Sequence, residues 1–527
     1  MVRKVLVTEK LSSAGIELLR RSCEVVEHPK PSAADLLRVI GDCDALLVRS
    51  ATRVTAEVLA TGSRLVVVGR AGTGVDNIDV RAATRRGIVV VNAPTSSTVA
   101  VAEHTIALML CLARHICEAN GSMHAGIWQK SALMGTELYD KVLGLVGLGR
   151  VGAAVAARVR GLEMRVLAYD PFVAPEKAAQ LNVELVGLDE LLACADYISL
   201  HAPSSERTRN MIGARELALM RPSARLINCA RGDLIAEEAL IEALTQGRLA
   251  GTALDVYPDE PKINPNLLRC PNLLLTPHLG ASTEEAQEDA ALQVVRAVLD
   301  VLEGRPPRYP VNVLALSVEE SAFLQPYLDL ASRMGHFCAQ FARQANHLTH
   351  LEMTYAGEVT EHDTTLVTAA ALVGLLSEVS EEPVNLVNAP IMARERGLVV
   401  SEVRTSSVHD SPPLLTLRTV TAHGERLLGG AMMRGQPHIV RIDDYWLDFV
   451  AQGLLLVSEH IERPGIIGQM GTLLGEVGVN ISFVQVGRQS RGGSGVMVLG
   501  VDDPLSPEIL ARMMTMPSIR SAHVIKL

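Results

Sequence analysis

Short apolar runs rich in β-branched residues alternate with helical patterns through the first 94 residues of the chain. Five such runs (KVLVTE, CEVVEH, ALLVRS, RLVVVGRAG and IVVVNAP) are separated by stretches such as SSAGIELLRR, in which apolar residues recur at helical spacing. This alternation predicts a sheet of strands joined by helices. It ends near Pro94, and the amphipathic stretch at 96–120 predicts one long helix that packs between two lobes.

A second alternating series begins at residue 141. Its six apolar runs (KVLGLVG, RVLAYD, YISLHAP, RLINCARGD, GTALDVYP and NLLLTPHLG) suit a parallel, doubly wound Rossmann sheet. The helical pattern at 281–304 is long enough to return to the first lobe before prolines end it. We therefore expect an α/β protein in which a cofactor domain, 95–282, is inserted into a flavodoxin-like substrate domain made of 1–94 and 283–310.

The rest of the chain divides into two further units. Residues 311–451 contain strand-like runs such as LLTLRTVT and HIVRIDD without a recognisable chemical motif, which predicts an α/β regulatory or spacer domain. Residues 452–527 show the order strand, helix, strand, strand, helix, strand, which is a ferredoxin-like βαββαβ module.

Composition narrows the function classes. A chain of 527 residues with 20% charged residues and a net charge of −10 carries no basic stripe for nucleic acid and no polybasic segment for a membrane. The N-terminal residues lack the apolar core of a signal peptide, so we expect a cytoplasmic protein. The eight cysteines form no metal-spaced pair, so we expect reduced, buried thiols and no metal site.

The segment KVLGLVGLGRVG predicts a dinucleotide-binding turn. Gly147, Gly149 and Gly152 follow an apolar strand and open a helix, whose N-terminal N–H groups favour the pyrophosphate anion. Asp170 ends the next strand, 18 residues beyond Gly152 (170 − 152). Its carboxylate would accept hydrogen bonds from ribose hydroxyls and repel a 2′-phosphate, which favours NAD over NADP. The alternatives are an Asp170 that caps a turn and an Arg150 that lies in solvent instead of reaching the pyrophosphate.

Three polar residues stand at or just beyond the ends of predicted strands: Arg231 in NCARGD, Glu260 in LDVYPDEP and His278 in TPHLGAST. Carboxyl ends of parallel strands share one edge of a sheet, so these residues are expected to meet beside the nicotinamide. Oxidation of a 2-hydroxy acid needs a base, a cation for the carboxylate and a hydride acceptor, and His278, Arg231 and NAD supply them. Taken singly, Arg231 could be a surface ion-pair residue, Glu260 a turn residue and His278 a capping or core histidine.

These motifs, preceded by RAGTGVDNID at 70–79, resemble those of the D-isomer specific 2-hydroxyacid dehydrogenases, and within them the long-form phosphoglycerate dehydrogenases with an intervening domain and an ACT domain. The resemblance covers essentially the whole chain. It implies NAD-dependent oxidation of D-3-phosphoglycerate to 3-phosphooxypyruvate, the first step of L-serine biosynthesis. It also implies a homo-oligomer that is at least a dimer, with a tetramer as a further option, and L-serine as a candidate effector.

The resemblance assigns roles to individual residues. Arg231 would hold the substrate carboxylate, Glu260 would support the imidazole, and His278 would transfer the proton. The implied cofactor contacts are Thr73, Gly147, Gly149, Arg150, Val151, Gly152, Asp170, Ala202, Cys229, Ala230, Asp255, Gly280 and Ala281. The implied substrate contacts are Arg49, Ala71, Gly72, Gly74 and, from a partner subunit, Lys130, and the implied effector contacts are His460, Glu462 and Asn480.

Some positions depart from the family pattern or have simpler interpretations. Lys130 stands where relatives carry Arg, Glu462 where serine-responsive relatives commonly carry Asp, and Ala202 where some carry a hydroxyl. Arg49 could be a solvated strand-end charge, and the last module could serve dimerisation alone. The apolar spacing around His104 indicates packing of a dimer helix.

Two other functions compete with the one implied. The same frame could act on another D-2-hydroxyacid or reduce 2-oxoglutarate, and some relatives of this fold are NAD-sensing, corepressor-like binding proteins. The complete set of Arg231, Glu260 and His278 argues for an enzyme.

Overall fold

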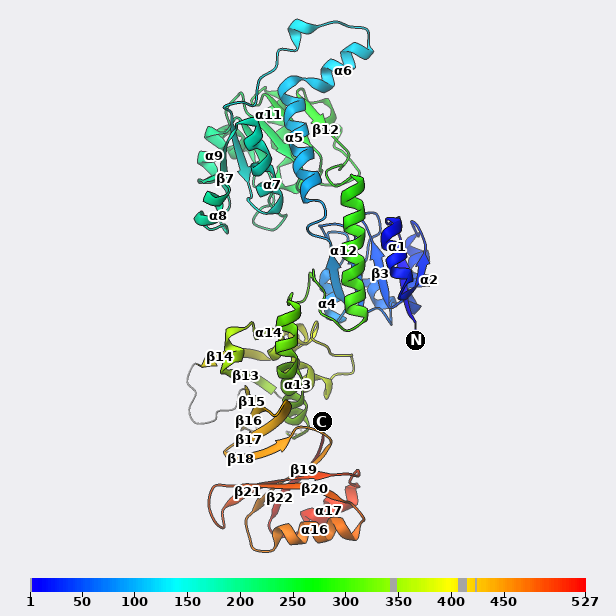
Figure 1. The fold of residues 1–527 in the computed structure, drawn as a ribbon, viewed down its shortest axis with the longest axis vertical. Coiled ribbons are helices and arrows are strands. Elements are labelled where there is room, and N and C mark those ends of the chain that lie inside the picture. The colour runs from blue at the N-terminus through cyan, green and yellow to red at the C-terminus, as the bar shows by residue number, and fades with distance from the viewer. Residues whose placement is uncertain (1, 342–347, 406–414, 422–423) are drawn as a thin grey trace.

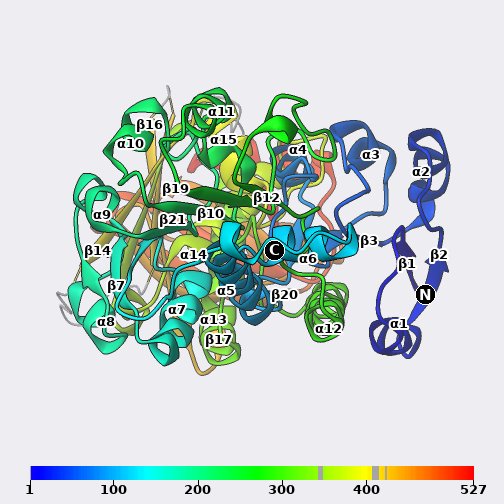
Figure 2. The same ribbon diagram turned by 90° about the horizontal axis from the view of Figure 1, so that it is seen from above.

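The computed structural model describes residues 2–341, 348–405, 415–421 and 424–527. Four sheets follow one another, and Figure 1 shows the modules that they form arranged along the longest axis. The inserted module lies at one end, the first lobe beside it, and the last two modules toward the other end. Figure 2, seen along that axis, places β1 and β2 at one edge of the view.

The first sheet has five parallel strands in the order β2-β1-β3-β4-β5. The strands are β1 (Arg3–Val7), β2 (Cys23–Glu27), β3 (Ala45–Val48), β4 (Val67–Arg70) and β5 (Val89–Asn92). The covering helices are α1 (Ser13–Arg20), α2 (Ala33–Val39), α3 (Ala56–Thr61), α4 (Val80–Arg85) and the distant α12 (Glu284–Leu302). Ala291, Val294 and Val298 of α12 are buried with Val5 and Val67 of the sheet, so the helix after the insertion does return to the first lobe.

The second sheet has seven parallel strands in the order β12-β11-β10-β9-β6-β7-β8. They are β6 (Val142–Val146), β7 (Arg165–Tyr169), β8 (Glu184–Leu185), β9 (Tyr197–Leu200), β10 (Arg225–Asn228), β11 (Gly251–Leu254) and β12 (Leu273–Leu275). The helices are α5 (Thr98–Arg114), α7 (Arg150–Val159), α8 (Pro175–Gln180), α9 (Leu188–Cys194), α10 (Ala214–Leu219) and α11 (Glu237–Thr245). The six predicted runs are all strands, and only the two-residue β8 lacked an apolar run. The strand order reverses between β6 and β9, where ligands bind in this fold.

The stretch at 96–120 is not one helix, and this prediction is wrong. α5 ends at Arg114, His115 adopts a left-handed conformation with φ 52° and ψ 36°, and α6 (Ile116–His124) continues at a bend of 64°. His115 Nδ1 lies 2.9 Å from Glu118 Oε2, so a local side-chain contact accompanies the break. The apolar pattern continues through the bend, which explains why periodicity alone predicted a single helix.

The third module pairs a mixed sheet, ordered β14-β13-β15-β16-β17-β18, with helices. Its helices are α13 (Val318–Phe341), α14 (Thr365–Ser377) and α15 (Ala389–Glu395), and its strands are β13 (Leu348–Ala356), β14 (Val399–Thr405), β15 (Leu415–Thr421), β16 (Gly424–Met433), β17 (Gln436–Ile442) and β18 (Tyr445–Val450). It touches the first lobe through Arg85 and Glu395, 2.6 Å apart, and through Asn385 Nδ2, which donates to the Gly87 carbonyl at 2.9 Å.

The last module is an antiparallel sheet in the order β20-β21-β19-β22 with two helices, which is the predicted βαββαβ arrangement. Its elements are β19 (Leu454–Ile461), α16 (Ile466–Glu476), β20 (Ile481–Arg488), β21 (Ser494–Val501), α17 (Pro507–Met514) and β22 (Ile519–Lys526). Side chains alternate along β19: Leu455 and Val457 enter the core of the third module, whereas Leu456 packs under α16. The last two modules therefore share a core.

The structure bears on two expectations drawn from composition, the burial of the cysteines and the absence of a membrane-spanning segment. All eight cysteines are free thiols, but only Cys23, Cys43, Cys229 and Cys338 are buried, and Cys117 is exposed, so the prediction of uniform burial is wrong. Within the described ranges, no single helix is long and apolar enough to cross a membrane; the bent pair α5 and α6 reaches the required length and hydropathy only when joined.

Candidate active site

The side chains of His278 and Glu260 form a pair at the carboxyl end of the second sheet. His278 Nδ1 lies 2.7 Å from Glu260 Oε2, and Glu260 Oε1 accepts a hydrogen bond from the Tyr257 backbone N–H at 2.9 Å. The hydrogen bond that His278 donates to Glu260 raises the pKa of His278 against the opposing effect of burial. Burial raises the pKa of Glu260, but the bonds from His278 and Tyr257 outweigh it and the net pKa is lowered. A charged Glu260 therefore fixes a proton on Nδ1 and leaves the Nε2 lone pair of a neutral ring free.

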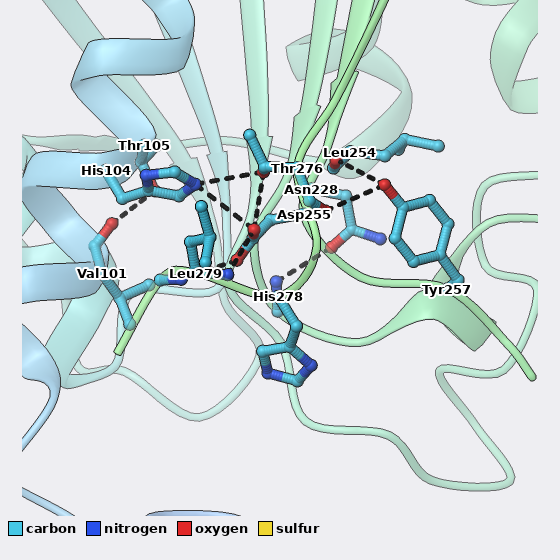
Figure 3. Close-up of polar contacts among 12 residues, drawn as sticks. Val101, His104, Thr105, Asn228, Leu254, Asp255, Tyr257, Thr276, His278 and Leu279 are labelled. Atoms are coloured by element: carbon cyan, nitrogen blue, oxygen red, sulfur yellow. Dashed lines mark hydrogen bonds and ion pairs between the residues drawn. The ribbon is translucent and has the colours of Figure 1, made fainter. Parts of the chain in front are cut away.

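A buried carboxylate holds the backbone on either side of His278. Asp255 is 1% exposed and accepts hydrogen bonds from the Thr276 hydroxyl at 2.6 Å and from the backbone N–H groups of Leu279 and Gly280 at 2.7 and 2.8 Å. His104 Nε2 lies 3.3 Å from Asp255 Oδ1 (Figure 3). Burial raises the pKa of Asp255, but these bonds outweigh it and the pKa lies below its usual value.

This network changes the interpretation of two residues. The resemblance assigned Asp255 to the cofactor, and the apolar spacing assigned His104 to dimer packing. In the structure, α5 places His104 beside Asp255, whose carboxylate holds the loop that carries His278. Figure 3 shows the imidazole of His278 directed away from this network. No sequence signal pointed to the role of His104, because a histidine inside an amphipathic helix has no distinctive spacing.

Arg231 reaches from the second sheet to the loop after β4 in the first lobe. Its Nε lies 3.5 Å from Asp76 Oδ2, and its Nη1 donates to its neighbour's carbonyl at Ala230. A Cβ built on Gly74 would lie 2.4 Å from Arg231 Nη2, so the guanidinium packs directly against the backbone of this loop. The first lobe and the inserted module therefore meet at this cation.

The glycine-rich turn is built as a dinucleotide turn requires. Gly147 has φ 101°, and a Cβ on it would lie 2.7 Å from the His201 carbonyl oxygen. A Cβ on Gly152 would lie 2.2 Å from the Gly147 carbonyl oxygen. Gly149 caps α7 without any side-chain hydrogen bond, so the first N–H groups of this helix have no capping side chain. This local geometry fits a pyrophosphate.

The other predicted cofactor residues surround this turn. Asp170 accepts hydrogen bonds from the Leu148 and Phe172 backbone N–H groups at 2.8 and 2.9 Å, so it caps the turn as the simpler interpretation required. Its carboxylate keeps further lone pairs that could accept hydrogen bonds from ribose hydroxyls. Arg150 is exposed, and its Nη1 donates to the Pro94 carbonyl at 3.1 Å. The remaining contacts lie at helix starts and strand ends on the same edge: Val151, Ala202, Cys229, Ala230, Gly280 and Ala281.

The substrate-side residues divide into two groups. Ala71, Gly72 and Gly74 lie in the loop after β4 together with the predicted cofactor contact Thr73, whose Oγ1 is 3.1 Å from Ser97 Oγ before α5. Lys130 is exposed in the short turn Lys130–Ala132. The chain that follows this turn returns to the C-terminal end of α5, the end opposite to Ser97. A 17-residue helix spans about 25 Å, so Lys130 does not reach the site of its own subunit.

The predicted effector residues lie at two opposite ends of the last sheet: His460 and Glu462 lie at the end of β19 beside Arg488, and Asn480 precedes β20 beside Asp502. Glu462 forms an ion pair with Arg488 and accepts a hydrogen bond from the Gly492 backbone N–H at 2.6 Å. Asn480 Nδ2 donates to Asp502 Oδ2 at 2.7 Å. His460 is 1% exposed, and its Nδ1 finds no hydrogen-bond partner among the residues that the structure describes.

Similarity to known proteins covers the whole chain. Residues 106–280 match the D-isomer specific 2-hydroxyacid dehydrogenase NAD binding domain, and residues 323–443 match the D-3-phosphoglycerate dehydrogenase intervening domain. The D-3-phosphoglycerate dehydrogenase of Synechocystis sp. is 42% identical over 99% of this chain and 95% of its own length. That of Methanocaldococcus jannaschii is 40% identical over 99% and 100%.

The chain belongs to the D-3-phosphoglycerate dehydrogenase family. The predicted family, Rossmann fold and NAD cofactor are thereby confirmed. Solved structures agree for the first two modules: a glyoxylate reductase from Paecilomyes thermophila is 30% identical with a TM-score of 0.55, and covers 59% of this chain and 98% of its own. The D-lactate dehydrogenase of Escherichia coli is 26% identical with a TM-score of 0.53, and covers 58% and 99%. The family thus shares its catalytic frame with other 2-hydroxyacid dehydrogenases.

Proposed function

We propose that this member of the D-3-phosphoglycerate dehydrogenase family oxidises D-3-phosphoglycerate to 3-phosphooxypyruvate with NAD, as the entry step of L-serine synthesis in the cytoplasm. The observation that carries the proposal is the hydrogen-bonded pair of His278 and Glu260 on the same sheet edge as Arg231. The names of relatives that align over nearly their whole length support the choice of substrate.

NAD would be held by the turn of Gly147, Gly149 and Gly152 and by Asp170. The space left by the missing Cβ atoms and the uncapped start of α7 fit its pyrophosphate. Bound NAD supplies the hydride acceptor.

The chain's own residues perform the remaining chemistry. Arg231 binds the substrate carboxylate and orients the C2 hydroxyl toward His278. The Nε2 atom of His278 takes the hydroxyl proton as the carbonyl forms. Glu260, ionised and bonded to Nδ1, stabilises the imidazolium that results.

The direct test is a steady-state assay of NADH formation with NAD and 3-phosphoglycerate. His278→Ala should lower kcat by about a hundredfold to ten-thousandfold, the scale of a positioned general base. The matched control is His350→Ala, which removes an exposed histidine of the third module and should leave kcat unchanged. Near wild-type turnover of His278→Ala would overturn the assignment.

We propose further that the enzyme is a homodimer or a tetramer whose subunits exchange the segment after α6. Large apolar side chains are exposed there, Trp128 at 78% and Met134 at 82%, and Met123 near the end of α6 is 56% exposed. Exposure of this kind marks an interface. Lys130 lies in the same segment and would reach the phosphate side of the partner's site. Sedimentation of the wild type as a monomer, or a dimer that persists unchanged in Trp128→Ser with Met134→Ser, would contradict this interface.

We also propose L-serine as an effector of the last module, bound at a subunit interface by Glu462 beside His460 of one subunit and by Asn480 of another. Its ammonium group would compete with Arg488 for the Glu462 carboxylate. Calorimetric titration of the full chain with L-serine should detect binding that Glu462→Gln weakens at least tenfold. A flat titration of the wild type would remove the effector and leave the catalytic proposal standing.

A further inference from the structure

The hydroxyl group of Tyr257 joins the carboxyl ends of two neighbouring strands. Tyr257 is 7% exposed, and its hydroxyl donates to the Thr276 carbonyl at 2.9 Å and lies 3.2 Å from the Leu254 carbonyl, which shares the same hydrogen (Figure 3). Leu254 ends β11, and Thr276 directly follows β12. Burial and the charges of Asp255 and Glu260 raise the pKa of Tyr257 to about 12, so the hydroxyl remains a donor at neutral pH.

The Thr276 carbonyl also accepts a hydrogen bond from the backbone of His278. The His278 N–H donates to it at 3.1 Å and to the Asp255 carbonyl at 2.9 Å. His278 adopts a left-handed conformation with φ 56°, which is unfavourable for a residue with a side chain and persists only where the surroundings hold it. The Tyr257 hydroxyl and the His278 N–H therefore share one carbonyl, and a fixed carbonyl fixes the turn that directs the imidazole.

The backbone of Tyr257 contacts the segments that carry the other two residues of the site. Its N–H donates to Glu260 Oε1 at 2.9 Å, while Glu260 Oε2 bonds the ring of His278. A Cβ built on Gly232 would lie 2.0 Å from the Tyr257 carbonyl carbon, so the backbone of Tyr257 packs directly against the residue that follows Arg231. The segments that carry His278, Glu260 and Arg231 thus all meet at this one tyrosine.

We propose that Tyr257 is a positioning residue for the oxidation, whose hydroxyl holds the turn before His278 so that the imidazole can contact Glu260 and the substrate hydroxyl together. This inference rests on the proposed function. The ring of Tyr257 lies in the apolar core of the second sheet, and its hydroxyl is directed at backbone carbonyls. Tyr257 therefore acts through the turn and not on the substrate itself.

The test removes only the hydroxyl oxygen, in Tyr257→Phe, and measures the rate of NADH formation in a single turnover with 3-phosphoglycerate. A single turnover reports the chemical step even where product release limits kcat. Loss of one hydrogen bond of ordinary strength should slow this step about three- to tenfold. The KM for NAD should stay at the wild-type value, because the glycine-rich turn follows β6 and shares none of these bonds.

The matched control is Tyr355→Phe, which removes a buried hydroxyl from the third module. Tyr355 is 0% exposed, and its hydroxyl lies 2.6 Å from Thr368 Oγ1. Both variants lose one buried hydrogen bond, so both should lower Tm by similar amounts. Only Tyr257→Phe should slow the single turnover. Single-turnover rates that are the same in the two variants would reduce Tyr257 to a structural contribution and overturn the proposal.

The pKa of His278 provides a second measurement, which needs no substrate. The charged groups that act on this imidazole are Glu260, Asp255 and Arg231, and Tyr257→Phe retains all three. If the turn relaxes, the hydrogen bond from His278 to Glu260 weakens, and the pKa of His278 should fall because that bond is the main cause of its rise.

Diethyl pyrocarbonate modifies neutral imidazole, and the side chain of His278 is 51% exposed to it. The rate of this modification, followed at His278 by peptide mass spectrometry over a range of pH, gives the pKa in the wild type, Tyr257→Phe and Tyr355→Phe. A pKa of His278 that is the same in all three would overturn the role of Tyr257. A wild-type enzyme inactive on 3-phosphoglycerate would instead refute the proposed function, and the pKa of His278 would still decide the role of Tyr257.

Discussion

Replacing Asp255 by Asn tests how the catalytic loop is held. The carboxylate now accepts the Thr276 hydroxyl and the Leu279 N–H at Oδ1 and the Gly280 N–H at Oδ2. An amide has one accepting oxygen. With that oxygen at the Oδ1 position, the NH2 group faces the buried N–H of Gly280, and two donors oppose each other.

The expected cost follows from that one lost acceptor. A buried N–H left without a partner costs about 1–3 kcal/mol. For a unit of about 150–250 residues, each kcal/mol lowers the melting temperature by about 2–4 °C, so Asp255→Asn should melt about 2–12 °C lower. Because Leu279 and Gly280 directly follow His278, a shift of about 1 Å in the loop would lower kcat/KM by about a hundredfold.

Differential scanning fluorimetry and the NADH assay measure the two effects on the same samples. The control is Asp189→Asn, which makes the same exchange at a surface carboxylate paired with Arg215 and 58% exposed. Exposed pairs contribute little, so this variant should change neither quantity measurably. If Asp255→Asn and Asp189→Asn behave alike, Asp255 does not hold the loop and the reasoning fails.

Three further changes give separate expectations. Glu260→Gln removes the main cause of the raised pKa of His278. Because oxidation needs the neutral imidazole, the acidic limb of the plot of kcat/KM against pH should move to lower pH. An acidic limb that does not move would contradict the pairing of His278 with Glu260. Gly152→Ala places a Cβ 2.2 Å from the Gly147 carbonyl oxygen and should raise the KM for NAD at least tenfold, with an unaltered value counting against the turn as the NAD site. Arg49→Ala should raise the KM for 3-phosphoglycerate about tenfold or more but scarcely that for D-2-hydroxyglutarate; equal effects on both would favour a substrate without phosphate.

Much of the fold was predictable because strand and turn signals in this chain are local. Many of the parallel strands are short runs rich in β-branched residues. The glycines of the dinucleotide turn stand where another backbone segment comes too close to leave room for a Cβ atom. The His278–Glu260 pair followed from strand-end positions, since carboxyl ends of parallel strands meet at one edge. In these cases the structural constraint acts on residues that are close together in the sequence or at equivalent strand ends, so the sequence pattern reveals it.

The errors and omissions concern contacts between distant segments. The bend at His115 does not interrupt the apolar periodicity, so the pattern at 96–120 could not reveal it. The link from His104 to Asp255 joins residues 151 positions apart (255 − 104), and neither lies in a motif that names the other. The hydroxyl of Tyr257 bonds the Thr276 carbonyl across two strand ends, and the spacing of the motifs does not encode this contact.

The return of α12 to the first sheet determines how the two lobes can move. The chain crosses between them twice, once between β5 and α5 and once between β12 and α12. Two covalent connections leave essentially one free motion, a rotation about the line that joins them. Opening along this axis separates Arg231 from Asp76, and closing restores the contact. The same rotation would therefore admit the substrate and bring Arg231 against the first lobe around it.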